Sequence, residues 1–209
     1  MVTFKDLVAD NPKFEKERKE SLEKLKKTAR SISEAELLQA FYGFIGYYIS
    51  AFQGIEAKLD QIILLSVGEE RWHVGQSLIS RISNREKIEL VNTIVSSSAI
   101  SDGGAFQKEW LRAFGKLMLR LKVEGDRRNK IVHSTYLFDF MQIGVPPIRS
   151  KRVRRKGKVD FDREYFDLVS INLITSEILE LEIDVGFMKT QLIHWHKDLS
   201  RPSSRQDSK

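Results

Sequence analysis

Three long stretches of this chain place apolar residues three and four positions apart, and no other feature restricts the possible folds as strongly. Side chains at these intervals share one face of an α-helix, and that face must be buried against other elements. The first stretch holds Leu37, Leu38, Phe41, Ile45, Tyr48, Phe52, Ile55, Leu59, Ile62 and Ile63. It predicts a long core helix that begins at a capping box of Ser31 and Glu34 and ends near Gly68.

Three further helices are predicted from the same kind of spacing. A second capping box, Ser83 with Glu86, opens a shorter helix whose apolar side is Ile88, Val91, Ile94 and Val95. The run 96–104, rich in serine and glycine, ends that helix. The next helix, weakened by Gly125, carries Phe106, Trp110, Phe114, Leu117 and Leu121. The last long helix carries Leu168, Ile171, Ile174, Ile178, Leu181, Val185, Met188, Leu192 and Trp195.

The segments between and outside these helices complete the predicted fold. In 137–162, Phe138 and Phe140 alternate with Asp139 as in a strand, and prolines interrupt the pattern, so a small β-hairpin or irregular insertion is expected before the last helix. Residues 1–30 predict a peripheral charged helix, and 201–209 predict a disordered tail. Residues 31–200 are therefore expected to form one all-α domain, an antiparallel four- to five-helix bundle with the 137–162 insertion.

Composition narrows the classes of protein to which the chain can belong. It has no cysteine, which excludes a disulfide framework and a thiolate zinc site. Its first residues are too charged for a signal peptide or a membrane span, so we expect a cytoplasmic protein without a membrane partner. Thirty-five Lys and Arg residues against 29 Asp and Glu residues give a net charge of +6, which favours contact with a polyanion.

The run 127–134 reads Arg-Arg-Asn-Lys-Ile-Val-His-Ser and holds the residue types that phosphodiester chemistry needs. An imidazole exchanges protons near neutral pH, and a guanidinium is a permanent charge whose fork suits phosphate oxygens. Cleaving RNA without a metal requires one group to remove the 2′-hydroxyl proton, one to stabilise charge on phosphorus and one to protonate the 5′-oxygen. Histidine and arginine can fill these roles, although Arg128 and His133 differ by about 140° in direction on an ideal helix.

Arg128-Asn129, three residues and then His133 resemble the Arg-x4–6-His motif of the HEPN superfamily, in its Arg-Asn-x3-His form. The predicted bundle, with its insertion before the last helix, resembles that superfamily over most of 33–197. The resemblance implies a metal-independent ribonuclease, a hydrolase that leaves 2′,3′-cyclic phosphate and 5′-hydroxyl ends. It further implies a homodimer in which both protomers line one cleft, no cofactor, and a role as a toxin or antiviral defence effector with an antitoxin or defence-system partner.

The resemblance also suggests roles for single residues. Arg128 is expected to bind the phosphate and stabilise the transition state, and His133 to act as acid or base or to orient the nucleophile. Asn129 lies four residues before His133, where its amide either orients the imidazole or contacts the scissile phosphate. In HEPN-like bundles, an acidic residue at the position of Glu56 can hold the motif arginine. The alternative for Arg128, which does not depend on the resemblance, is an intrahelical pair with Glu124 four residues earlier, and both roles can hold at once.

Tyr136 marks a departure from one branch of the superfamily. HEPN toxins that pair with a minimal nucleotidyltransferase often continue as His-x-Tyr, and the tyrosine is modified by the partner. This chain has His-x-x-Tyr, so that kind of antitoxin is not expected. Tyr136 stays a supporting residue of the site.

Cations around the motif are predicted to contact RNA. They are Arg127 and Lys130 beside the motif and Arg149, Lys151, Arg152, Arg154, Arg155, Lys156 and Lys158 in the insertion. Such contacts weaken steeply with salt, and the alternative is a solvated loop. Two other functions remain open: a non-catalytic module that binds RNA, nucleotides or a protein in the same cleft, and a helical adaptor. No metal site is expected, because His194 and His196 point to different sides of their helix.

Overall fold

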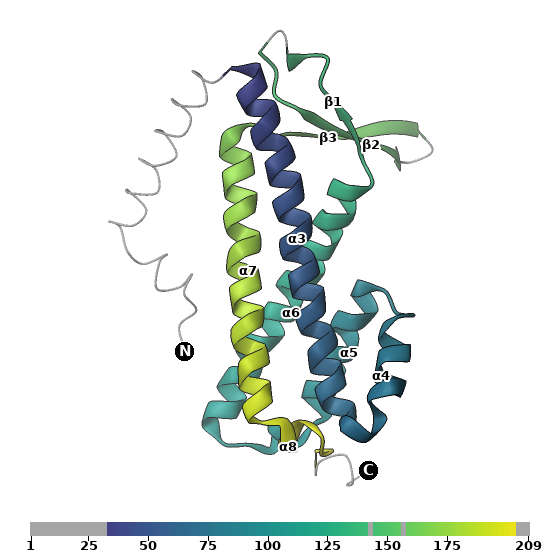
Figure 1. Cartoon of the computed structure of the whole chain (residues 1–209), viewed down its shortest axis with the longest axis vertical. Coiled ribbons are helices and arrows are strands. Elements are labelled where there is room, and N and C mark those ends of the chain that lie inside the picture. The colour runs from purple at the N-terminus through teal and green to yellow at the C-terminus, as the bar shows by residue number, and fades with distance from the viewer. Residues whose placement is uncertain (1–32, 142–143, 156–157, 204–209) are drawn as a thin grey trace, which may run out of the picture. The chain divides into compact units, whose positions relative to one another are not determined.

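The computed structural model describes residues 33–141, 144–155 and 158–203, and all structural statements below concern these ranges. They are predominantly helical, with six α-helices and one small antiparallel sheet (Figure 1). The helices are α3 (Glu34–Val67), α4 (Trp72–Ile79), α5 (Asn84–Ser97), α6 (Ala105–Val132), α7 (Leu168–His194) and α8 (His196–Leu199), with short 3-10 turns at Glu69–Arg71 and Ala99–Asp102. The strands are β1 (Thr135–Leu137), β2 (Ile148–Arg155) and β3 (Lys158–Tyr165). No helix in these ranges has a stretch long and apolar enough to cross a membrane.

The chain is divided into two compact units, each built from two segments. The sheet unit combines the residues up to Ile49 with Arg127–Glu177, and the helical unit combines Ser50–Asp126 with the residues from Ile178 onwards. The helices α3, α6 and α7 each contribute to both units.

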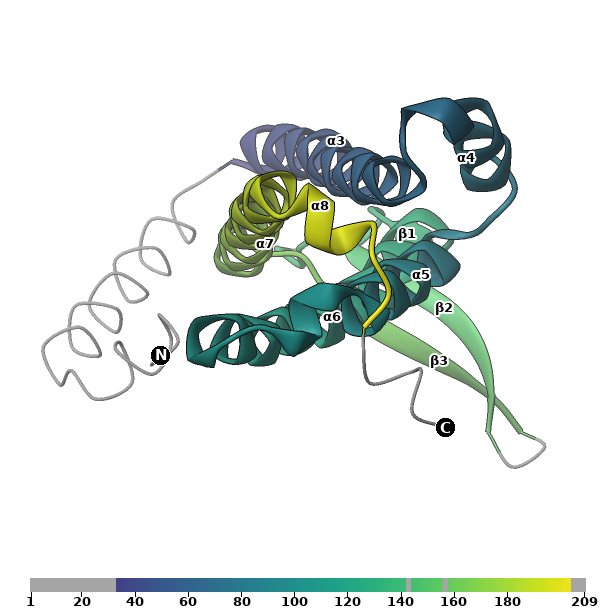
Figure 2. The same cartoon turned by 90° about the horizontal axis from the view of Figure 1, so that it is seen from below.

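The apolar stripes predicted from the sequence form the core of the helical unit. Its most deeply buried members are Phe52, Ile55, Leu59, Ile62, Ile63, Val91, Val95, Leu121, Ile178, Val185 and Leu192. Burying each such side chain stabilises the fold by about 1.5–3 kcal/mol before the entropy of ordering it is counted. The prediction of long core helices from 3.6-residue periodicity is therefore confirmed, and Figure 2 shows α8 crossing one end of this unit between α3 and α6.

The helices of this unit do not all run antiparallel. Lys58 Nζ donates to Glu182 Oε1 at 2.8 Å. Further along both helices, Lys189 Nζ, seven residues after Glu182, donates at 2.9 Å to Gln61 Oε1, three residues after Lys58. Because both partners advance together, α3 and α7 run parallel, as Figure 1 also shows. The expectation of a fully antiparallel bundle is wrong for this pair.

The capping boxes explain where two helices begin. Ser83 N donates to Glu86 Oε2 at 2.6 Å and Glu86 N donates to Ser83 Oγ at 3.3 Å, so the box predicted for α5 is confirmed. The helix α3 begins at Glu34, and its box joins Ser33 to Glu36. The predicted pair of Ser31 with Glu34 is therefore two residues too early.

Two segments of the helical unit differ from the prediction. The helix α4 was not predicted, because its only buried residue is Gly75. Arg201 and Ser203, assigned to a disordered tail, are held by hydrogen bonds: Arg201 O accepts from Ala99 N, and Ser203 N donates to Ser97 O, both at 2.8 Å. The rest of the predicted tail, 204–209, and the predicted helix 1–30 lie outside the described residues.

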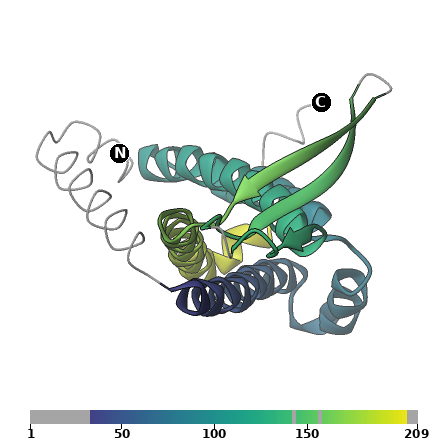
Figure 3. The ribbon, with the colours of Figure 1, turned by 90° about the horizontal axis from the view of Figure 1, so that it is seen from above.

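The sheet unit contains a three-stranded antiparallel sheet in the order β1-β2-β3, whose β2–β3 hairpin is a long twisted ribbon in Figure 3. The predicted hairpin is confirmed and gains β1 as a third strand. Phe138 and Phe140 lie beyond β1, so the strand expected there is wrong. Tyr136 of β1 packs on Phe41 of α3, with ring centroids 5.1 Å apart, and Phe166 after β3 packs on Phe41 at 5.6 Å. These buried aromatic contacts fix the sheet against the first part of α3.

Candidate ribonuclease motif and its surroundings

The motif lies at the C-terminal end of α6, which runs without a break through Gly125 to Val132. Gly125 therefore does not end the helix. A Cβ atom at this position would lie 3.3 Å from Asn84 Nδ2, so the glycine leaves room for the close approach of α5. The helix α6 is therefore continuous up to the motif.

The last carbonyl groups of α6 accept hydrogen bonds from residues that follow the helix. His133 N donates to Asn129 O at 3.1 Å, Ser134 Oγ donates to Lys130 O at 2.5 Å, and the Tyr136 hydroxyl donates to Ile131 O at 2.8 Å. Carbonyls at a helix end need such partners, because no following turn supplies N–H groups. The end of α6 is thus capped by the backbone of His133 and by the hydroxyl groups of Ser134 and Tyr136.

The side chains of the motif are accessible. His133, Asn129 and Lys130 are exposed, and Arg128 is half-buried, with its Nη1 donating to Asn129 Oδ1 at 3.2 Å. The structure therefore brings Arg128 and Asn129 together. His133 follows the last residue of α6, and because His133 N donates to Asn129 O as in a helix, we expect Arg128 and His133 to stand about 140° apart.

Arg127 and Glu177 form an ion pair between α6 and α7 in the sheet unit. Arg127 Nη1 donates to Glu177 Oε2 at 2.6 Å, and the arginine side chain is 30% exposed. A charge-assisted bond of this length fixes the orientation of the guanidinium. The predicted RNA contact of Arg127 therefore competes with a bond inside the protein.

Among the cations of the insertion whose side chains the structure describes, Arg149 is the most buried, with 3% of its side chain exposed. Its Nε donates to Glu164 Oε2 at 2.8 Å, its Nη2 to Asp162 Oδ2 at 3.0 Å and its Nη1 to Ser134 Oγ at 3.3 Å. Burial lowers the pKa of Arg149, but the bonds to Asp162 and Glu164 outweigh this effect and raise the pKa above its usual value. Arg149 therefore joins β2 and β3 to the residue that follows α6. This role is structural and differs from the predicted RNA contact.

Tyr136, on β1, is the direct partner of Arg149, on β2. Burial raises the pKa of Tyr136 to about 12; the charge of Arg149 lowers it and that of Glu164 raises it further. Its hydroxyl is bonded to Ile131 O, as described above. Tyr136 thus supports the helix end and stays neutral at physiological pH.

The remaining predicted residues are distributed over both units. Lys151 is half-buried and Arg152 is exposed on β2. Arg154, Arg155 and Lys158 lie on the strands, but their side chains and the whole of Lys156 lie outside the described residues. Glu56 is half-buried in α3 and Glu124 is buried in α6, both in the helical unit.

The sequence prediction missed the exposed row of Phe161, Arg163 and Tyr165 on β3. These residues alternate with Asp162 and Glu164, which is the period of a strand with two different faces. This alternation is visible in the sequence. It was missed because the insertion was expected to end at 162.

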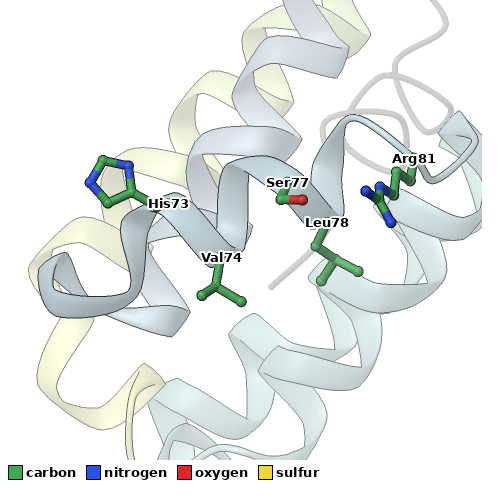
Figure 4. Close-up of a pocket in the computed structure, with 5 residues that line it drawn as sticks. All are labelled: His73, Val74, Ser77, Leu78 and Arg81. Atoms are coloured by element: carbon green, nitrogen blue, oxygen red, sulfur yellow. The ribbon is translucent and has the colours of Figure 1, made fainter.

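The described residues offer no candidate metal site. They contain no group of three or more His, Asp or Glu side chains that could hold a metal ion. An open depression on α4 is lined by His73, Val74, Ser77, Leu78 and Arg81. Figure 4 shows the first four side chains spread along α4 and Arg81 beyond its end, with His73 and Arg81 at opposite ends of the depression.

The chain was compared with protein-family models, with curated proteins and with solved structures. In none of the three comparisons did anything match this chain.

Proposed function

We propose that this protein is a metal-independent endoribonuclease of HEPN type, acting in the cytoplasm as a toxin or defence effector. One observation carries the proposal: Arg128, Asn129 and His133 stand at a helix end that is capped by other groups, with the imidazole of His133 exposed. The imidazole of His133 is therefore not one of the groups that cap this helix end, and it is accessible to a substrate.

The reaction uses only groups that the chain contains. A base removes the proton of a ribose 2′-hydroxyl, the 2′-oxygen attacks phosphorus, and the bond to the 5′-oxygen breaks as that oxygen is protonated. His133 serves as the acid or the base, and Arg128 stabilises the negative charge of the phosphorane. The products are a 2′,3′-cyclic phosphate and a 5′-hydroxyl.

The position of the motif determines what holds the phosphate. The C-terminal end of a helix carries partial negative charge and offers carbonyls, not N–H groups. A phosphate at the end of α6 must therefore be bound by cationic side chains, and Arg128 and Lys130 lie there. This requirement fits an arginine-containing motif better than a site built from backbone amides.

The geometry also favours a homodimer. On an ideal helix, residues five apart point in directions about 140° apart, so we expect that one chain does not present both Arg128 and His133 to the same phosphate. Two chains related by a two-fold axis can each contribute both groups to a common cleft. An antitoxin or another defence protein that covers this cleft would keep the enzyme inactive.

The test is incubation of purified protein with total RNA, followed by mapping of the new ends. Wild type should produce 2′,3′-cyclic phosphate ends, with or without EDTA, and Arg128→Ala and His133→Ala should each abolish them. His194→Ala replaces an exposed histidine of α7 and serves as the matched control, with cleavage like wild type. Equal cleavage by the Arg128→Ala/His133→Ala double variant would refute the proposal.

A non-catalytic binding module is the second candidate. The observation that favours it is that the helix α6 continues through Arg128 to Val132, because a regular helix would separate Arg128 from His133 and leave a single chain able to bind a phosphate without cleaving it. RNA recovered intact from a stable complex, without cyclic phosphate ends, would support this function instead.

A further inference from the structure

The two faces of the β2–β3 hairpin carry different side chains. Directly paired residues of an antiparallel sheet point to the same side, and Arg152 pairs with Phe161 while Ser150 pairs with Arg163. Tyr165 follows two residues after Arg163 and lies on the same side. We call Arg152, Phe161, Arg163 and Tyr165 the outer face. All four are exposed, with Phe161 52% and Tyr165 51% accessible.

The acidic residues of β3 turn to the opposite face. Asp162 and Glu164 lie between the residues of the outer face, and both are paired with the buried Arg149. The described side chains of the outer face therefore include two guanidinium groups and no carboxylate. This separation of charge gives one face of the hairpin a positive potential close to two exposed rings.

The rings and cations of the outer face are arranged for stacking. The guanidinium carbon of Arg163 lies 5.9 Å from the centre of the Phe161 ring, a cation–π contact. Phe161 and Tyr165 are four residues apart on one strand, about 13 Å, so each can stack on a separate base. Aromatic rings beside arginines on an open sheet surface are the features by which proteins bind unpaired nucleotides.

We infer that the outer face binds single-stranded RNA, stacking bases on Phe161 and Tyr165 while Arg152 and Arg163 contact the phosphates. The inference rests on the proposed function and names its substrate class. A duplex is a poorer ligand for this face, because its bases are already stacked on one another. The face belongs to the same unit as the motif, and Arg149 links β2 and β3 to Ser134, the residue after His133.

The test is fluorescence anisotropy of a labelled single-stranded oligouridine and of an RNA duplex of equal length. His133→Ala is the background for all variants, so that no RNA is cut. Phe161→Ala and Tyr165→Ala should each weaken single-strand binding about 5- to 150-fold, the range expected for loss of one stacked base. Phe140→Ala removes an exposed aromatic residue outside the strands and should bind normally. Phe161→Tyr should retain most of the affinity.

The cations are tested separately, which keeps the inference open to refutation if the ring variants fail to fold. Arg152→Gln and Arg163→Gln should each reduce the slope of log affinity against log salt concentration by about 0.7. Arg112→Gln, at an exposed position of α6, should leave this slope unchanged. Unchanged single-strand affinity in the folded ring variants, or unchanged slopes in the arginine variants, would overturn the inference.

The remaining outcomes separate this inference from the proposed function. Equal affinity for the duplex or for polyglutamate would also overturn it, in favour of a general polyanion or acidic-protein surface. Wild-type cleavage with ring variants that bind normally would refute the outer face but not the ribonuclease. Single-strand binding that depends on the rings, with no cyclic phosphate ends from wild type, would refute the ribonuclease but not the outer face.

Discussion

Replacement of Arg149 by methionine tests whether the buried guanidinium holds the sheet unit together. Methionine keeps much of the length and apolar volume of the side chain but removes its bonds to Asp162, Glu164 and Ser134. Removing one partner of a fully buried ion pair costs about 3–5 kcal/mol. The two carboxylates are 32% and 40% exposed, so water can solvate them after the change, and we expect a loss of about 2 kcal/mol.

Thermal unfolding followed by circular dichroism measures this loss. In a chain of this size, 1 kcal/mol corresponds to about 2–4 °C, so Arg149→Met should lower the midpoint by about 4–8 °C. Arg152→Met is the matched control, because it changes the same residue type on the exposed face of the same strand and should stay within about 0.5 kcal/mol of wild type. If both variants unfold at the same temperature, the structural role of Arg149 is wrong.

Two other predictions concern the ends of helices. Tyr136 should ionise with a pKa of about 12, and Tyr136→Phe should remove this step from the absorbance titration of tyrosinate. Because the unfolded chain ionises this group near pH 10, the stability of wild type should fall as pH rises from about 10 to about 12, and the variant should show less of this fall. Ser83→Ala removes the capping box with Glu86 and should cost about 1 kcal/mol in urea unfolding, whereas Ser176→Ala, at an exposed position inside α7, should cost less. An equal loss in both serine variants would contradict the capping role.

The long helices could be predicted because burial imposes a period on the sequence. In each of α3, α5, α6 and α7, the apolar stripe lies on one side of the helix, and most of its members are in the core. The short helix α4 could not be predicted in this way. Its Val74 and Leu78 are 68% and 44% exposed, and the residue that it buries is Gly75, which carries no apolar side chain.

The surroundings of the site depend on contacts that a local pattern does not contain. Arg149 stands in a run of cations, but the acids that neutralise it, Asp162 and Glu164, follow 13 and 15 residues later. Their meeting depends on the register of β2 and β3, and a shift of one residue would exchange the two faces of the strand. The parallel direction of α3 and α7 likewise depends on how the chain is connected, and apolar spacing does not encode it.

The central claim is that an arginine and a histidine from two chains act on one phosphate. The direct test mixes Arg128→Ala protein with His133→Ala protein, allows the subunits to exchange, and maps cyclic phosphate ends in RNA. Each variant alone should be inactive, and the mixture should regain activity, because about half of its dimers contain one intact Arg128 and one intact His133. A mixture that stays inactive although mixed dimers are present would contradict the shared site.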